Sequence, residues 1–198
     1  MLHIQDLIEN IKSTTVPEDR KRVLAPLIDY IIGTQINKEL TQLNFICTHN
    51  SRRSQFSQVW AQIAANHFGV KAKCYSAGVE VTACNERTVE SLKRFGLIVN
   101  SSGVENPKYL ITYSKDSPPV LCFSKLFSDK SSPTKDFAVI MTCADANENC
   151  PVIPSAKARL PIRYEDPKKY DDTRLEEIMY DERSMQIASE MFWVFKNV

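Results

Sequence analysis

The chain has 198 residues, of which 43% are apolar and 25% charged, and its net charge is +1. This length and composition fit one globular domain with a sizeable core, or two small domains. The near-zero net charge argues against nucleic acid or an anionic membrane as a partner, because no overall field would attract either. Any binding of an anion must therefore be local.

The first residues, "MLHIQDLIENIK", do not resemble a signal peptide. They carry acidic side chains where such a peptide needs a basic start and an unbroken apolar stretch. No window of the sequence approaches the length of a membrane span. We therefore expect a cytoplasmic protein with no membrane partner.

The cysteine and histidine pattern argues against both a disulfide framework and a zinc site. Without a secretion signal, cysteines are better interpreted as reduced, buried or catalytic thiols. No C-x2-C pair occurs and the three histidines are scattered, so we expect no bound metal. The six cysteines are Cys47, Cys74, Cys84, Cys122, Cys143 and Cys150, and the histidines are His3, His49 and His67.

Residues 1–40 are predicted to form a helical extension that precedes the main domain, residues 41–198. "HIQDLIENIK" repeats apolar residues at helical spacing, and a second helix is expected after Pro17, with a break or kink at Pro26. The extension could cap the sheet, form a homodimer contact or dock a partner. Burial of its apolar face within the same chain is the simplest expectation.

After residue 40 the pattern alternates between strand and helix. "LNFIC" and "KAKCYSAG" are typical of buried strands, whereas "SQFSQVWAQIAANHF" and "NERTVESLKRFG" have helical periodicity. Residues 100–135 interrupt the alternation and hold two runs typical of strands, so we interpret them as an inserted hairpin or flap. "FAVIMTC" and "ARLPIRY" are further strand candidates, and residues 171–198 form a long amphipathic helix.

This order predicts an α/β fold with a doubly wound, four-stranded parallel sheet. Functional loops of such folds lie beyond the carboxyl ends of the strands. Cys47 and Cys143 each follow a predicted core strand at that end. Both thiols are therefore candidates for chemistry.

The stretch "FICTHNSRRSQ" places Cys47 in a loop between a strand and a helix N-terminus. Backbone N–H groups converge in such a loop, and the helix dipole adds positive potential, so an oxyanion can bind and a thiolate is stabilised there. Arg53 can offer a two-pronged donor set to that anion. Ser54 can donate to the thiolate, and Asn50 tolerates a left-handed turn. A buried core cysteine and a solvated arginine are the alternative.

The motif "CTHNSRRS" resembles the catalytic loop of low-molecular-weight protein tyrosine phosphatases and of the thioredoxin-coupled arsenate reductases that share their fold. The resemblance implies a catalytic Cys47, with Arg53 and Ser54 assisting it. It also implies an oxyanion cradle that comprises Thr48, His49, Asn50, Ser51, Arg52 and Arg53. Arg52 could instead face solvent and adjust only the local potential.

"TCADANENCP" favours the reductase branch, because it resembles the redox segment of those reductases. A second thiol can attack the sulfur that carries arsenic, which releases arsenite and leaves a Cys47–Cys143 disulfide. Cys150 would then attack Cys143 and pass the disulfide to thioredoxin. The alternative is that Cys143 and Cys150 are structural. Cys74, Cys84 and Cys122 are assigned to packing.

The resemblance places the general acid at Asp166, in "YEDPKKYDD", with Glu165 as a competitor. An ordinary turn is the alternative, since Asp-Pro pairs are common in turns. Phosphatases often carry tyrosines after this pair, whereas Lys168 and Lys169 follow here. Some related reductases hold potassium near the loop with the help of a glutamate, and Gln58 stands at its place, which argues against tight potassium binding.

Three interpretations follow: an arsenate reductase that uses thioredoxin, a phosphatase that acts on phosphate monoesters, and a binding module that responds to an oxyanion or to redox state. We further hypothesise that the insertion at 100–135 covers the redox segment and controls access of thioredoxin.

Overall fold

The computed structural model describes residues 4–198, without the side chains of residues 4, 5 and 149. His3, at the start of the first expected helix, lies outside the described residues. The helices are α1 (Ile4–Ser13), α2 (Glu18–Ile36), α3 (Arg53–His67), α4 (Glu86–Arg94), α5 (Ala144–Asn149), the short 3-10 helix η1 (Pro167–Tyr170) and α6 (Glu176–Lys196).

The central sheet has four parallel strands, as the sequence predicted, and their order is β2-β1-β6-β7. They are β1 (Thr41–Cys47), β2 (Ala72–Gly78), β6 (Phe137–Met141) and β7 (Ala156–Pro161). Cys47 is the last residue of β1, and Cys143 follows the end of β6 by two residues. The two thiols therefore lie at the same edge of the sheet, because the strands are parallel and adjacent.

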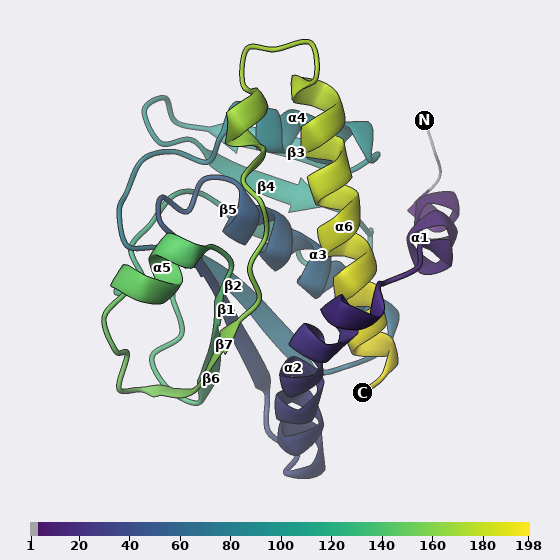
Figure 1. The fold of residues 1–198 in the computed structure, drawn as a ribbon, viewed down its shortest axis with the longest axis vertical. Helices are drawn as coiled ribbons and strands as arrows, with labels where there is room; N and C mark the ends of the chain where they lie inside the picture. Colours follow the sequence, from purple (N-terminus) through teal and green to yellow (C-terminus); the bar gives the residue numbers. More distant parts are fainter. Residues whose placement is uncertain (1–3) are drawn as a thin grey trace.

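Each face of this sheet has its own core, because successive side chains of a strand point to opposite faces. Phe45 and Ile140 face the larger core, which α2, α3, α4 and α6 cover. Ile46 and Met141 face a smaller one that includes Cys47 and residues of α5. Figure 1 shows α5 and α6 on opposite sides of the sheet. The strands β1 and β6 carry no charged residue, as expected of strands buried on both faces.

The insertion forms a second, antiparallel sheet in the order β3-β4-β5. Its strands are β3 (Ile98–Ser102), β4 (Lys108–Thr112) and β5 (Val120–Cys122), and it lies beyond the upper ends of the parallel strands in Figure 1. The predicted hairpin corresponds to β4 and β5. The sequence analysis did not identify β3, whose pattern is mostly exposed and polar.

The N-terminal extension packs its apolar face within the chain. Both α1 and α2 contact α6, and α2 also contacts β1 and β7. A break at Pro26 does not occur, since α2 continues from Glu18 to Ile36, but the helix changes direction along its length in Figure 1, in agreement with the alternative of a kink. Arg20 forms a bidentate ion pair with Glu190 of α6, with both N···O distances 2.8 Å. A homodimer contact through this extension stays a prediction.

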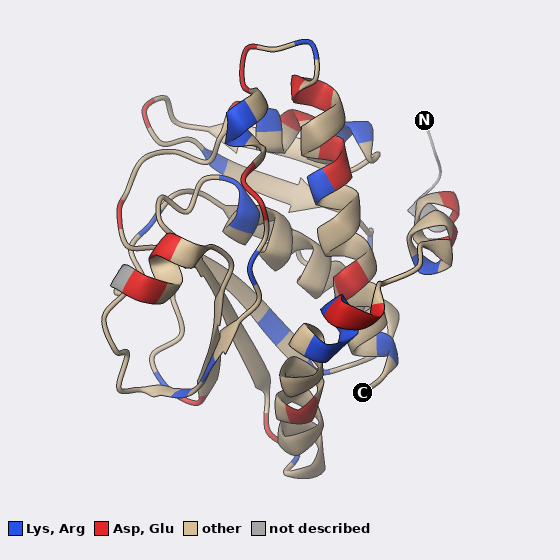
Figure 2. Ribbon diagram, viewed as in Figure 1, with Lys and Arg blue, Asp and Glu red and all other residues tan. Residues whose placement is uncertain are grey.

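Charged residues of both signs are interspersed over the molecule in the view of Figure 2, in keeping with the small net charge. Among the described residues, no helix combines the length and the apolar character that crossing a membrane requires.

Candidate active site

The loop between β1 and α3 has the geometry of an anion cradle. Asn50 adopts the left-handed conformation with φ of 47°, and α3 begins at Arg53. The backbone N–H groups of residues 48–52 donate no hydrogen bond to any described residue. Unpaired N–H groups beside a helix N-terminus form a site for an oxyanion.

Cys47 lies at the base of this loop and is 4% exposed. Its Sγ atom is 3.1 Å from the hydroxyl oxygen of Ser54. Asn50 donates to that same oxygen at 2.8 Å, which leaves the Ser54 proton free to point toward the sulfur. The roles predicted for Ser54 and Asn50 therefore have matching geometry: Ser54 can stabilise a thiolate, and Asn50 orients Ser54.

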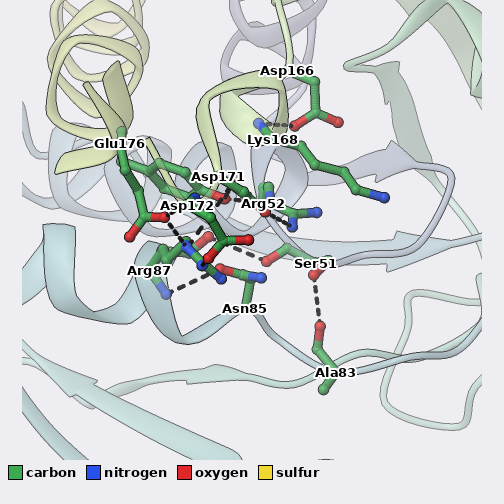
Figure 3. Close-up of polar contacts among 12 residues, drawn as sticks. Ser51, Arg52, Ala83, Asn85, Arg87, Asp166, Lys168, Asp171, Asp172 and Glu176 are labelled. Carbon is green, nitrogen blue, oxygen red and sulfur yellow. Dashed lines mark hydrogen bonds and ion pairs between the residues drawn. The ribbon is translucent and has the colours of Figure 1, made fainter. Parts of the chain in front are cut away.

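Three side chains of the predicted cradle, those of Thr48, His49 and Ser51, have partners outside the loop. The Thr48 hydroxyl donates to Asp145 at 2.6 Å, and the His49 imidazole lies 3.1 Å from Glu80. Ser51 donates to the backbone oxygen of Ala83 at 2.7 Å, which Figure 3 shows. These residues can contact an oxyanion through their backbone N–H groups, and their side chains hold the loop in place.

The end of β2 and the insertion both contact the cysteine loop. A Cβ atom on Gly78 would lie 2.7 Å from the Thr48 oxygen and 2.8 Å from the Asn50 nitrogen, so only glycine fits there. The Lys125 N–H donates to the Asn50 side chain at 3.1 Å, and the Ser124 hydroxyl donates to the His49 oxygen at 2.8 Å. The insertion is thus part of the active-site architecture.

Arg53 and Asp166 form an ion pair across the site, with an Nη2 to Oδ2 distance of 2.6 Å. Arg53 also donates to the backbone oxygen of Tyr164 at 3.2 Å, while its buried Nε has no partner among the described residues. An incoming oxyanion can accept from Nε and replace Asp166 on the guanidinium. Glu165, the competing acid, is exposed and lies 3.7 Å from Lys169.

Cys143 and Cys150 lie in the same buried cluster as Cys47, with exposed fractions of 2% and 5%. Cys143 caps the N-terminus of α5, and its sulfur accepts from the Ala146 N–H at 3.3 Å. The Thr48 hydroxyl lies 3.5 Å from that sulfur, so the cysteine loop and the redox segment are in direct contact. Among the insertion's apolar residues, Phe127 packs against this cluster.

Arg159 of β7 bonds the backbone of residues 146–151, which belong to the predicted redox segment. Its guanidinium donates to the backbone oxygens of Ala146, Asn147, Cys150 and Pro151, at 2.8 to 3.4 Å. Burial raises the pKa of the Cys150 thiol, and the positive charge of Arg159 opposes that rise. These bonds tie the backbone around Cys150 to β7 while Cys143 and Cys150 are free thiols.

The other three cysteines are buried and carry no reactive signature. Burial raises the pKa of Cys122 to about 12, and it raises the pKa values of Cys74 and Cys84 strongly as well. Thiols of this kind stay protonated and unreactive. Their geometry agrees with the packing role expected from the sequence.

The residues at the suggested potassium position do not fit a cation cage. Gln58 accepts from the Ser76 hydroxyl at 2.5 Å and donates to the Leu121 oxygen at 3.2 Å. Gln55 donates to the backbone oxygens of Asn50 and Phe123. Amide N–H groups thus occupy the carbonyl oxygens that a cation would need. Within the described chain, no cluster of three or more His, Cys, Asp or Glu residues could hold a metal ion.

Sequence reasoning missed four residues that contact the predicted site: Asp145, Arg159, Asp171 and Tyr180. Asp145 lies two residues after Cys143, and Asp171 lies five residues after Asp166 in the same quoted motif, so nearness in sequence was a usable signal for both. Arg159 and Tyr180 lie outside the quoted motifs.

Comparisons with known proteins agree with this geometry. Residues 42–109 match the family model described as low molecular weight phosphotyrosine protein phosphatase. An arsenate reductase of Bacillus licheniformis is 28% identical over 139 residues, which cover 70% of this chain and 83% of that protein. Arsenate reductase 2 of Staphylococcus saprophyticus is 29% identical over 123 residues, which cover 62% and 76%.

Among solved structures, a low molecular weight protein tyrosine phosphatase from T. tengcongensis aligns with a TM-score of 0.50 and 15% identity. The alignment covers 80% of this chain and 99% of that one. At this identity the match establishes the fold. The predicted fold class is thereby confirmed.

Proposed function

We propose that this chain, a member of the low-molecular-weight phosphotyrosine phosphatase superfamily, is an arsenate reductase that works through three thiols and is recycled by thioredoxin. The observation that carries the proposal is the shared buried cluster of Cys47, Cys143 and Cys150. A phosphatase has no need of the second and third thiols. The names of the curated relatives support the same choice.

The first step is the attack of the Cys47 thiolate on arsenic. Arsenate sits in the cradle of backbone N–H groups and takes the Arg53 guanidinium from Asp166. Asp166 then protonates the departing oxygen, which leaves as water. The product is a Cys47 sulfur–arsenic(V) adduct, and Ser54 stabilises the thiolate before the attack.

The second and third steps move electrons through the relay. Cys143 attacks the Cys47 sulfur, and the sulfur–arsenic bond breaks with its electron pair remaining on arsenic, so arsenite leaves and a Cys47–Cys143 disulfide forms. Cys150 attacks Cys143 and releases the Cys47 thiolate. The Cys143–Cys150 disulfide is finally reduced by the dithiol of thioredoxin. Because both cysteines are buried before the reaction, the redox segment must open for that last exchange.

The test is NADPH consumption by the reduced protein with thioredoxin, thioredoxin reductase and arsenate. Cys143→Ser should abolish arsenate-dependent oxidation, and Cys150→Ser should stop after one turnover as a Cys47–Cys143 disulfide that peptide mapping detects. Cys74→Ala is a matched control, since it removes a buried thiol outside the cluster. Full activity in Cys143→Ser would refute the relay.

Hydrolysis of phosphate monoesters is the second candidate, because Cys47, Arg53, Ser54 and Asp166 together suffice for it. The family model that matches residues 42–109 is that of a phosphatase. p-Nitrophenyl phosphate distinguishes the candidates. Hydrolysis that persists in Cys143→Ser, without any arsenate-dependent oxidation in the unmodified chain, would make the protein a phosphatase.

A further inference from the structure

Arg52 belongs to the cysteine loop by sequence, yet its side chain is directed away from the anion position. Its Nε donates to the Tyr180 hydroxyl at 2.6 Å, and its Nη2 donates to Asp171 at 3.0 Å. Figure 3 shows the guanidinium directed toward Asp171. Only 11% of the Arg52 side chain and 18% of the Asp171 side chain are exposed, so solvent screens this pair incompletely.

Arg52, Tyr180 and Asp171 form a triangle of hydrogen bonds, in which each side chain bonds the other two. Tyr180 of α6 accepts from Arg52 and donates its own proton to Asp171 at 2.8 Å. Burial raises the pKa of Tyr180, which keeps the hydroxyl protonated and able to donate. Both oxygens of Asp171 are thereby engaged, one by Arg52 and one by Tyr180. The triangle joins the cysteine loop, the acid loop and α6.

Asp171 is connected to the general acid through a short, hydrogen-bonded turn. The Asp171 N–H donates to the Lys168 oxygen at 3.0 Å, and the Lys168 N–H donates to the Asp166 side chain at 3.1 Å. The position of Asp171 therefore determines the position of Asp166. Arg87 of α4 holds the far end of the same loop through Asp172 and Glu176, at 2.7 and 2.6 Å.

We propose that Arg52 is a positioning residue: through Asp171 and Tyr180 it fixes the acid loop relative to the cysteine loop, and it does not bind the oxyanion. The proposal rests on the proposed function for the role of Asp166. A general acid contributes to the rate only when it lies within hydrogen-bond reach of the departing oxygen, so small displacements have large effects.

The test compares Arg52→Met, Arg52→Lys, Asp171→Asn and Tyr180→Phe with the unmodified chain. The control is Arg174→Met, which removes an exposed charged side chain three positions after Asp171. Three quantities are measured: kcat and KM for arsenate in the coupled assay across pH, the dissociation constant of inorganic phosphate, and hydrogen exchange in residues 166–172.

The expected result separates kcat from binding. Arg52→Met and Asp171→Asn should lower kcat by about 10- to 100-fold, flatten the alkaline limb that reports the acid, and raise exchange in residues 166–172. Phosphate affinity and KM should change little. Arg52→Lys should recover part of kcat. Because Arg52 and Asp171 form one ion pair, kcat of the Arg52→Met/Asp171→Asn double variant should be no lower than kcat of either single variant. Tyr180→Phe keeps the aromatic packing and should show a milder form of the same pattern.

A loss of phosphate affinity of tenfold or more in Arg52→Met, but not in Asp171→Asn, would overturn the proposal and make Arg52 an oxyanion ligand. Unchanged exchange in residues 166–172 would overturn it as well. Failure of the proposed function is distinguishable, because the unmodified chain would then show no arsenate turnover while phosphate binding and hydrogen exchange still report on Arg52.

Discussion

Asn44 is the residue whose environment is least expected from the surrounding sequence. It lies in the middle of β1, in register with Tyr75 and Val139 of the neighbouring strands, and is 1% exposed. Neither atom of its side-chain amide has a hydrogen-bond partner among the described residues. Burial of an unpaired amide is costly, so this position lowers the stability of the fold.

We therefore expect Asn44→Val to stabilise the protein by about 1 kcal/mol, which raises Tm by roughly 2–4 °C in a chain of this size. Valine also suits a buried strand. Urea unfolding measures the change, and Asn44→Asp, which buries a charge, should destabilise. A loss of stability in Asn44→Val would mean that the amide is hydrogen-bonded to an ordered water in solution.

At the same scale, the sequence indicated contacts within one segment better than the directions of side chains toward distant segments. The proximity of Cys47, Ser54 and Asn50 could be predicted, because it depends on residue type and on spacing within a single loop. The direction of Arg52 could not, since its partners Asp171 and Tyr180 lie 119 and 128 residues further along the chain. Nothing local distinguishes a guanidinium that binds an anion from one that binds a loop.

At the scale of elements, β7 and α5 form one unit through Arg159. Arg159→Met removes all four hydrogen bonds from the Arg159 guanidinium to the segment that carries Cys150. We expect a local loss of about 1 kcal/mol, which corresponds to roughly fivefold faster hydrogen exchange at residues 146–150. The Cys150 N–H, which donates to the Ala146 oxygen at 3.1 Å, is the most direct reporter.

Lys157→Met is the matched control for this experiment. Lys157 lies on the same strand, two residues away, and pairs with Glu39 and Asp136 instead of the redox segment. Its removal should leave exchange at 146–150 unchanged. Equal effects of the two variants would mean that β7 as a whole, and not Arg159, holds the segment closed.

The elements themselves were predictable to different degrees. The strand β6 is a continuous apolar run and β1 is mostly apolar, so both could be predicted as buried strands from that pattern. β3 was missed because its "IVNSS" is mostly exposed and forms a strand only by pairing with β4. Of the break or kink expected at Pro26, the break does not occur: α2 runs through it without interruption, and packing of Leu24, Leu27 and Ile31 against the core supports the helix on both sides.

For the whole molecule, the class of fold followed from alternating strand and helix patterns, whereas the order of strands in the sheet and the place of the insertion did not. We hypothesised a cover over the redox segment. In the structure Phe127 packs against the cluster that holds Cys143 and Cys150, Ser124 and Lys125 bond the cysteine loop, and β4 and β5 pack into the larger core. Control of thioredoxin access by the insertion stays a prediction. The bonds of Ser124 and Lys125 join segments 75 residues apart, and no local pattern encodes them.

That arrangement has a consequence for the folding pathway. Loop closure over long sequence separations is slow compared with helix formation, because the entropic cost comes before the contact is gained. The cradle needs closures over 75 residues, and the Arg53–Asp166 pair needs one over 113 residues. During refolding from urea, phosphate binding should therefore recover more slowly than ellipticity at 222 nm. Simultaneous recovery would contradict this order of events. A newly made chain would then pass through a stage in which it has its helices but cannot yet bind an anion.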